Sequence, residues 1–173
     1  MLKLTTDRLL MIPCSLHIAK AMAFNQDYLQ TFLLADVPDG WPADELKSFL
    51  PFYIEDIEKD PDLLGWGIWV LMDRNQNIVV GDAGFKGKPD PSGIVEIGYS
   101  VHADFRNRGY ASEAALALSD WAFTEHRNVR KIRAECDEEN VSSIRVLEKL
   151  GMNRQANDGR LLQWELDRKP EDS

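Results

Sequence analysis

The feature of this sequence that most restricts its fold is a change in the spacing of apolar residues along the chain. Apolar side chains first recur every three or four residues, which predicts helices over Ser15–Leu34 and Pro42–Lys59. The spacing then becomes that of β-strands, with turn residues between the runs. It predicts a meander of three strands over Trp66–Met72, Ile78–Phe85 and Ile94–Val101. A chain with both periods buries its helices against a sheet.

A strand–helix–strand unit continues from the third strand of this meander. Its helix covers Ser112–Glu125 and its second strand covers Lys131–Cys136, so its two strands should be parallel and joined by a right-handed crossover. The remaining predicted elements are a first strand over Leu2–Ile12, broken at Pro13, a helix over Val141–Leu150 and a last strand over Leu161–Leu166. We therefore predict an α+β fold of three layers (α/β/α), with a mixed, mostly antiparallel sheet, in a single domain over residues 1–173.

Charge and composition argue against several classes of protein. The chain has 20 Lys and Arg against 29 Asp and Glu, a formal net charge of −9, which disfavours binding to nucleic acid by bulk electrostatics. It has no run near the roughly 18 apolar residues of a membrane-spanning helix, and its N-terminus lacks the apolar core of a secretion signal. A cytoplasmic protein without membrane contact is expected. Cys14, Cys136 and the three histidines lack metal-ligand spacing, so we predict no metal site.

The segment most informative about function lies between the strand at 94–101 and the helix at 112–125. A glycine before a helix lets backbone N–H groups converge at the positive end of the helix dipole, and flanking arginines add charge. This pattern predicts a pyrophosphate-binding loop formed by Arg106, Asn107, Arg108, Gly109, Tyr110 and Ala111. The alternative is a solvated basic turn that uses its glycine only for conformation. Because neither a GxGxxG fingerprint nor a P-loop lysine is present, sites of the NAD or ATP type are not expected.

Several segments together resemble the GCN5-related N-acetyltransferase family. The Arg-x-x-Gly-x-Ala pattern over residues 106–111 is similar to that family's acyl-CoA pyrophosphate loop, residues 96–101 to its central strand, and residues 139–152 to its second motif. Residues 6–10 and 109–114 are similar to its branch of ribosomal-protein N-terminal acetyltransferases. The resemblance implies a GNAT-like acyl-CoA N-acyltransferase fold, acetyl-CoA as co-substrate and direct attack of an amine on the thioester.

The resemblance also implies roles for individual residues. The backbone at Val101 would pair with the pantetheine amides, Asn140 would face the pantetheine arm, and Ser143 would lie near the sulfur. Asn140 has a structural reason to occur as well, because asparagine is a favoured N-cap. Many members carry a tyrosine one turn after Ser143 as the general acid for the leaving thiolate, but here that residue is Leu147. Ser143, a water molecule or no acid at all must then serve.

A general base is predicted on the central strand. Alternation places Glu96 on one face of this strand with Gly98 and Ser100. If helices cover both faces of the sheet, burial would raise the pKa of Glu96 and suit it to accept a proton from an ammonium substrate. Alternatively, Glu96 is a strand-end carboxylate paired with an arginine. Asp82 on the neighbouring strand is the second candidate for the base.

The uneven distribution of charge bears on the acceptor. Residues 36–62 hold nine acidic and two basic residues (−9 + 2 = −7), whereas residues 102–133 hold six basic and four acidic residues (6 − 4 = +2). By resemblance, the first region helps to build the acceptor side, so we expect a cationic amine acceptor, either a protein N-terminus or a small molecule. A solvated helix face is the ordinary explanation for such acidity. Trp41, in a loop, is a candidate for lining the acceptor cleft.

Two other classes of function are alternatives to an N-acetyltransferase. A non-catalytic acyl-CoA-binding sensor or scaffold is compatible with the missing tyrosine, whereas Glu96 and Ser143 favour an enzyme. A dinucleotide-binding oxidoreductase lacks its glycine fingerprint. A monomer and a homodimer fit the sequence equally well.

Overall fold

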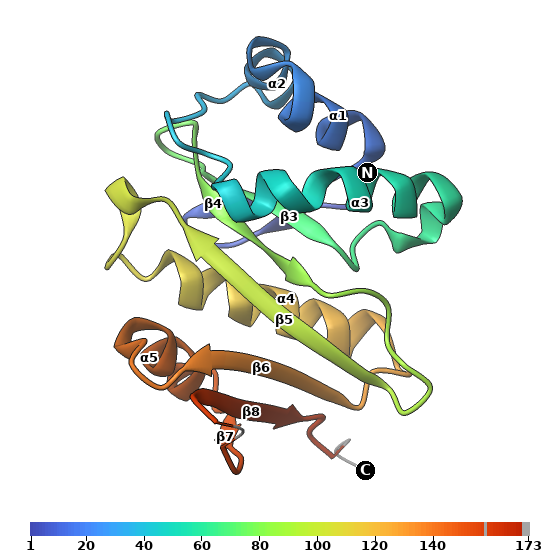
Figure 1. The fold of residues 1–173 in the computed structure, drawn as a ribbon, viewed down its shortest axis with the longest axis vertical. Coiled ribbons are helices and arrows are strands. Elements are labelled where there is room, and N and C mark those ends of the chain that lie inside the picture. The colour runs from blue at the N-terminus through green and yellow to red at the C-terminus, as the bar shows by residue number, and fades with distance from the viewer. Residues whose placement is uncertain (158, 171–173) are drawn as a thin grey trace.

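The computed structural model describes residues 1–157 and 159–170, whose strands form one mixed sheet (Figure 1). The strands lie side by side in the order β1-β2-β3-β4-β5-β6-β8-β7. Their bounds are β1 Leu4–Thr5, β2 Leu9–Pro13, β3 Ile68–Asp73, β4 Ile78–Phe85, β5 Ile94–Val101, β6 Lys131–Asp137, β7 Asn153–Arg154 and β8 Leu161–Asp167. β5 and β6 run parallel, and the other neighbouring strands are antiparallel. The predicted mixed sheet with one parallel βαβ unit is confirmed.

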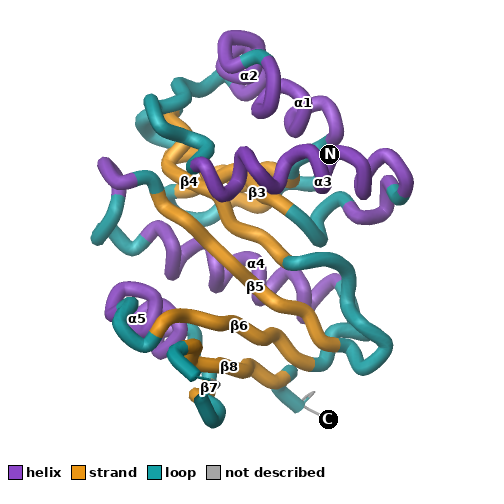
Figure 2. Tube along the Cα trace, in the orientation of Figure 1, coloured by secondary structure: helices purple, strands orange, loops and turns teal. Residues whose placement is uncertain are grey.

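Helices cover both faces of this sheet (Figures 1 and 2). One layer contains α1 Leu16–Phe24, α2 Gln26–Leu33 and α3 Asp44–Lys59, and the other contains α4 Tyr110–Glu125 and α5 Val141–Lys149. Short 3₁₀ turns follow α3 (η1 Pro61–Leu63) and β5 (η2 Ala103–Phe105). Two hydrophobic clusters result, because Val79 of β4 packs with α1–α3 whereas Val80, pointing the opposite way, packs with α4 and α5.

The two parallel strands separate along their length. β5 pairs with β6 from Ile94↔Lys131 to Glu96↔Arg133, and the pairing then stops although β5 continues to Val101. On its other edge the same end of β5 stays paired with β4, down to Gly81↔Val101. The carboxyl end of β5 therefore has one open edge, and it faces the gap toward β6.

The N-terminal third differs from the prediction in two places. The single strand predicted over Leu2–Ile12 is wrong, because β1 and β2 form a hairpin whose turn is closed by Thr6. The predicted end of the strand at Pro13 agrees with the end of β2. The single helix predicted over Ser15–Leu34 is also wrong. Asn25 ends α1 and starts α2, because its side chain accepts a hydrogen bond from the Tyr28 N–H at 3.1 Å and competes with helix continuation.

Other boundaries move by a few residues. α3 begins at Asp44 rather than at Pro42, and α4 begins at Tyr110, so Tyr110 and Ala111 belong to the helix and not to the loop before it. β7 was not predicted, because two residues are too short to show a period. Within the described residues, none of the helices has both the length and the apolar character needed to cross a membrane.

Candidate active site

A cavity of about 1020 Å³ opens where β5 and β6 separate. Its walls come from the end of β5, the loop before α4, the first turn of α4, and one face of α5 along its length. The structure brings together around it all the residues predicted to bind the co-substrate, namely Val101, Arg106, Asn107, Arg108, Gly109, Tyr110, Ala111 and Asn140, together with Ser143. Segments from residues 99 to 149 therefore meet at one site because the strand–helix–strand unit folds back on itself.

The loop before α4 carries two residues in the left-handed region. Asn107 has φ +62° and Gly109 has φ +83°, and Gly109 is the N-cap of α4. No side chain of the described residues caps this helix, so its first N–H groups have neither an intrahelical nor a side-chain partner. These groups lie at the positive end of a 16-residue helix, which is a favourable place for an anion.

The charged side chains in the described lining of the cavity are mostly basic. Arg106 and Arg108 come from the predicted loop, while Arg145 and Lys149 project from α5, and Glu148 is the acidic residue among the described lining residues. The carbonyl of Val101 accepts a hydrogen bond from Arg106 Nε at 3.1 Å, so this backbone oxygen already has a partner. The two basic residues of α5 were not among the predicted site residues, although their spacing of four residues places both on one helical face.

Ser143 is held by two neighbours at the start of α5. The side chain of Asn140 accepts a hydrogen bond from the Ser143 N–H at 3.1 Å and caps the helix. The hydroxyl oxygens of Tyr99 and Ser143 lie 2.7 Å apart. Burial raises the pKa of Tyr99, so this phenol stays protonated and can donate to the serine. Leu147 is fully buried in the core and supplies no polar group to the cavity.

Glu96 lies away from the cavity. It forms an ion pair with Lys86 and is outside the set of described residues that line the cavity. Glu96 is the last residue of β5 that pairs with β6, so it lies before the point where these two strands separate, which accounts for this placement. The structure thus gives Glu96 the ion pair of the alternative interpretation, with a lysine in place of an arginine.

Asp82 is also outside the described lining of the cavity, but it lies closer than Glu96 to the open end of β5. It pairs in register with Ser100, which lines the cavity, and so its side chain points to the same face of the sheet as that of Ser100. Its carboxylate accepts a hydrogen bond from Trp41 Nε1 at 3.0 Å. Burial raises the pKa of Asp82 to about 6, although the hydrogen bond from Trp41 opposes this shift. Trp41 itself is only 3% exposed and packs in the core beneath α1–α3.

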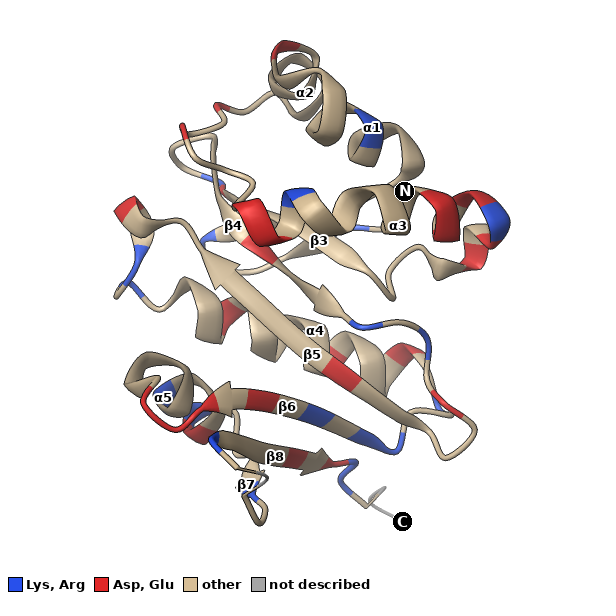
Figure 3. Cartoon of the chain, in the orientation of Figure 1, with Lys and Arg blue, Asp and Glu red and all other residues tan. Residues whose placement is uncertain are grey.

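The acidic residues of the segment 36–62 do not form one surface. Figure 3 marks acidic residues at the two opposite ends of α3. At the far end, Glu55 pairs with Lys59 at 2.7 Å, and Asp60 pairs with Lys88 at 2.5 Å. Near the end of β5, His102 Nε2 donates to the carbonyl of Asp39 at 2.7 Å and holds the loop before α3 against the strand.

Comparisons with known proteins agree with this geometry. Residues 8–153 match the family model described as an acetyltransferase (GNAT) domain. The uncharacterized N-acetyltransferase YjdG of Bacillus subtilis is 32% identical over 152 residues, which cover 87% of this chain and 89% of that protein.

Within the described residues, no group of three or more His, Cys, Asp or Glu side chains is placed to hold a metal ion.

Solved structures show the same fold at low identity. The ribosomal-protein-S5-alanine acetyltransferase of Vibrio fischeri superposes with a TM-score of 0.67 at 18% identity, over 98% of this chain and 100% of that chain. RimL, a ribosomal L7/L12 α-N-protein acetyltransferase solved in complex with coenzyme A, gives a TM-score of 0.63 at 15% identity, over 94% of this chain and 95% of that chain.

Proposed function

Because the chain belongs to the GNAT family and is an N-acetyltransferase, we propose that it uses acetyl-CoA to acetylate a cationic primary amine by direct attack on the thioester. The observation that carries this proposal is the cavity at the point where β5 and β6 separate, with the uncapped N-terminus of α4 in its wall. A helix N-terminus and four basic side chains suit the pyrophosphate and phosphate groups of the co-substrate.

The fit of this cavity to a bulky anion also rests on Gly109. A Cβ atom added there would come within 3.3 Å of Arg8 Nη2, in a backbone conformation that other residues rarely adopt. When bound, acetyl-CoA supplies an activated acetyl group. The protein would hold its pyrophosphate at the loop before α4 and its pantetheine arm along the open edge of β5, which brings thioester and amine together.

We propose Asp82 as the general base. Its carboxylate lies on the face of the sheet covered by α1–α3, beside the strand position that lines the cavity. A carboxyl group with a pKa of about 6 is ionised at neutral pH and still basic enough to accept a proton from an ammonium group. We propose further that Ser143, oriented by Tyr99, donates a hydrogen bond at the leaving sulfur, in the role that Leu147 cannot fill.

The acceptor is proposed to be a protein N-terminus or a small cationic amine. Two structural neighbours are named as acetyltransferases of ribosomal proteins, which supports a protein N-terminus as one class to test. The deciding experiment is a panel of amines with acetyl-CoA as donor, read by release of free CoA thiol. Turnover with a cationic amine is expected, and absence of turnover with every amine class would contradict the proposal.

Charge near the open end of β5 is expected to attract this acceptor. Replacing Asp39→Asn together with Asp44→Asn should raise the acceptor KM about threefold at low ionic strength, since exposed charge pairs contribute roughly 0.2–1 kcal/mol each. The effect should fade at physiological salt, where the Debye length is about 8 Å. The KM for acetyl-CoA should stay unchanged.

The matched control for this pair removes the same charge from the far end of α3. Asp56→Asn with Glu58→Gln lies about 18 Å along the helix from Asp44, and because a charge pair weakens with distance it should raise the acceptor KM much less at the same low ionic strength. An equal rise in KM for both pairs would show a general effect of net charge. No rise for either would mean that the acidity serves only to solvate the helix.

A further inference from the structure

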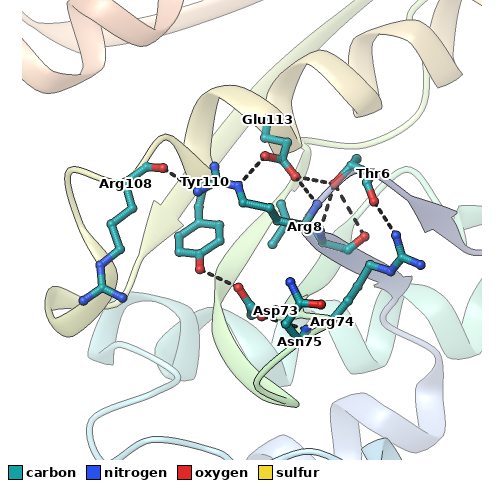
Figure 4. Close-up of polar contacts among 9 residues, drawn as sticks. Thr6, Arg8, Asp73, Arg74, Asn75, Arg108, Tyr110 and Glu113 are labelled. Atoms are coloured by element: carbon teal, nitrogen blue, oxygen red, sulfur yellow. Dashed lines mark hydrogen bonds and ion pairs between the residues drawn. The ribbon is translucent and has the colours of Figure 1, made fainter.

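A side chain from the N-terminal hairpin reaches the loop before α4 (Figure 4). Arg8, in the turn between β1 and β2, donates a hydrogen bond from Nη1 to the carbonyl of Arg108 at 2.7 Å. Its Nε donates to Glu113 Oε1 at 2.8 Å, and its guanidinium carbon lies 4.5 Å from the centre of the Tyr110 ring. One arginine thus contacts the loop, the first residue of α4 and the first turn of that helix.

The residues that Arg8 contacts are themselves anchored. Glu113 also accepts hydrogen bonds from Thr6 Oγ1 at 2.5 Å and from the Arg8 N–H at 3.0 Å. Although burial disfavours its charge, these hydrogen bonds and the guanidinium hold the pKa of Glu113 below its usual value. The Tyr110 hydroxyl donates to Asp73 Oδ2 at 2.6 Å, so the start of α4 is also tied to the end of β3.

The contact with Arg108 sets the direction of one peptide unit. In a trans peptide the C=O and the following N–H point in opposite directions. Because Arg8 holds the Arg108 carbonyl, the Gly109 N–H points away from Arg8, and its peptide unit cannot rotate without breaking this hydrogen bond. Left-handed backbone at a residue other than glycine costs of order 1 kcal/mol, so the conformation of Asn107 also needs support from its surroundings.

The ion pair with Glu113 has a second consequence. Glu113 lies in the first turn of α4, next to the place proposed for a polyanion. An unpaired carboxylate there would repel phosphate groups, and the guanidinium of Arg8 neutralises it at 2.8 Å.

We infer that Arg8 is a positioning residue for acetyl-CoA. It holds the loop before α4 in the conformation that receives the pyrophosphate, and it neutralises Glu113, before the co-substrate arrives. This inference rests on the proposed function, because it takes that loop as the pyrophosphate site. It assigns to the N-terminal hairpin a part in donor binding, although the hairpin does not line the cavity.

The test compares two donors that differ in the pyrophosphate. Arg8→Met, which keeps most of the side-chain volume and no donor, is expected to raise the Kd of acetyl-CoA about tenfold, equivalent to about 1.4 kcal/mol. The KM for S-acetylpantetheine, a thioester without pyrophosphate, should stay unchanged in the same full-length variant. Arg8→Lys keeps the charge but replaces the planar guanidinium, whose Nη1 and Nε bond Arg108 and Glu113 separately, with a single nitrogen, so most of the loss should persist.

The control is Arg74→Met. Arg74 donates to the Thr6 carbonyl at 2.8 Å and so supports the same hairpin without contacting the loop. Arg74→Met should change neither the Kd of acetyl-CoA nor the KM for S-acetylpantetheine. Adding Glu113→Gln to Arg8→Met should restore only part of the affinity for acetyl-CoA, because the Arg108 carbonyl still lacks the hydrogen bond that Arg8 donates.

The inference would be overturned in either of two ways: unchanged acetyl-CoA affinity in both Arg8 variants, or equal losses toward both donors. Should Arg8→Met fail to fold, as judged from its thermal melting, Arg8→Lys decides by the same comparison. If the unaltered protein binds no acetyl-CoA, it is the proposed function that fails, and the two failures are therefore distinguishable.

Discussion

Gly109→Val is expected to remove most of the increase in melting temperature that acetyl-CoA gives to the unaltered protein. A ligand at 100 times its Kd stabilises the native state by about 2.7 kcal/mol, which for a chain of this size raises Tm by roughly 5–10 °C. Gly109 has φ +83°, where a β-branched residue is strongly disfavoured, and a Cβ atom would lie 3.3 Å from Arg8 Nη2. The loop must shift, and its N–H groups no longer converge.

The matched control for this variant is Gly87→Val. Gly87 has φ +98°, and an added Cβ there would meet nothing within 4 Å. The strain in the backbone is comparable, but the residue lies in the loop between β4 and β5 and outside the described lining of the cavity. Differential scanning fluorimetry with and without acetyl-CoA should show a full ligand shift for Gly87→Val. A full shift for folded Gly109→Val as well would place the pyrophosphate elsewhere.

The fold was predictable where it depends on local periodicity. The strand–helix–strand unit follows from apolar spacing and from the handedness of crossovers, and it fixes where the parallel strands meet. The break at Asn25 was not predictable from apolar spacing, because the apolar residues on both sides keep helical intervals while a single side-chain hydrogen bond ends the helix. The hairpin at Thr6 was not predictable from apolar spacing either, because its turn depends on a hydrogen bond from the Leu9 N–H to the Thr6 side chain.

The candidate site was predictable where its residues are neighbours in the sequence. The loop before α4 has its own signature of arginines and a glycine, and Asn140 and Ser143 share one helix start. The contacts that give these residues their chemistry join distant segments. Tyr99 meets Ser143 across 44 residues, and Trp41 meets Asp82 across 41, so no local pattern contains either pair.

Asp82→Asn is expected to lower kcat by roughly a hundredfold or more at neutral pH, because a general base commonly contributes a factor of 10² or greater. The asparagine oxygen can still accept the hydrogen bond from Trp41, so the site should keep its shape. In the unaltered protein, kcat/KM should rise with pH through about 6, as Asp82 loses its proton. The variant should lack this step, and its deficit should shrink at high pH, where the amine arrives already neutral.

The matched control is Glu96→Gln, which removes a carboxylate from the same face of the sheet but farther from the open end of β5. It should change kcat little. A large loss for Glu96→Gln with a small one for Asp82→Asn would return the role of base to Glu96. Acetyl-CoA binding should be nearly unchanged in both variants, which separates a defect in proton transfer from a defect in donor binding.

Asp82→Asn should raise the stability of the protein at neutral pH, although it lowers activity. Burial raises the pKa of Asp82 to about 6 from its ordinary value near 4, so the native state holds this proton more tightly than the unfolded chain. The stability that comes with protonated Asp82 is complete below about pH 4 and is lost as the pH rises through 6. Asp82→Asn carries no such charge and should therefore melt higher than the unaltered protein at pH 7.5, with the difference vanishing near pH 4. A variant that is slower yet more stable would identify Asp82 as a group kept for its chemistry, whereas a lower Tm at pH 7.5 would show that its carboxylate supports the fold.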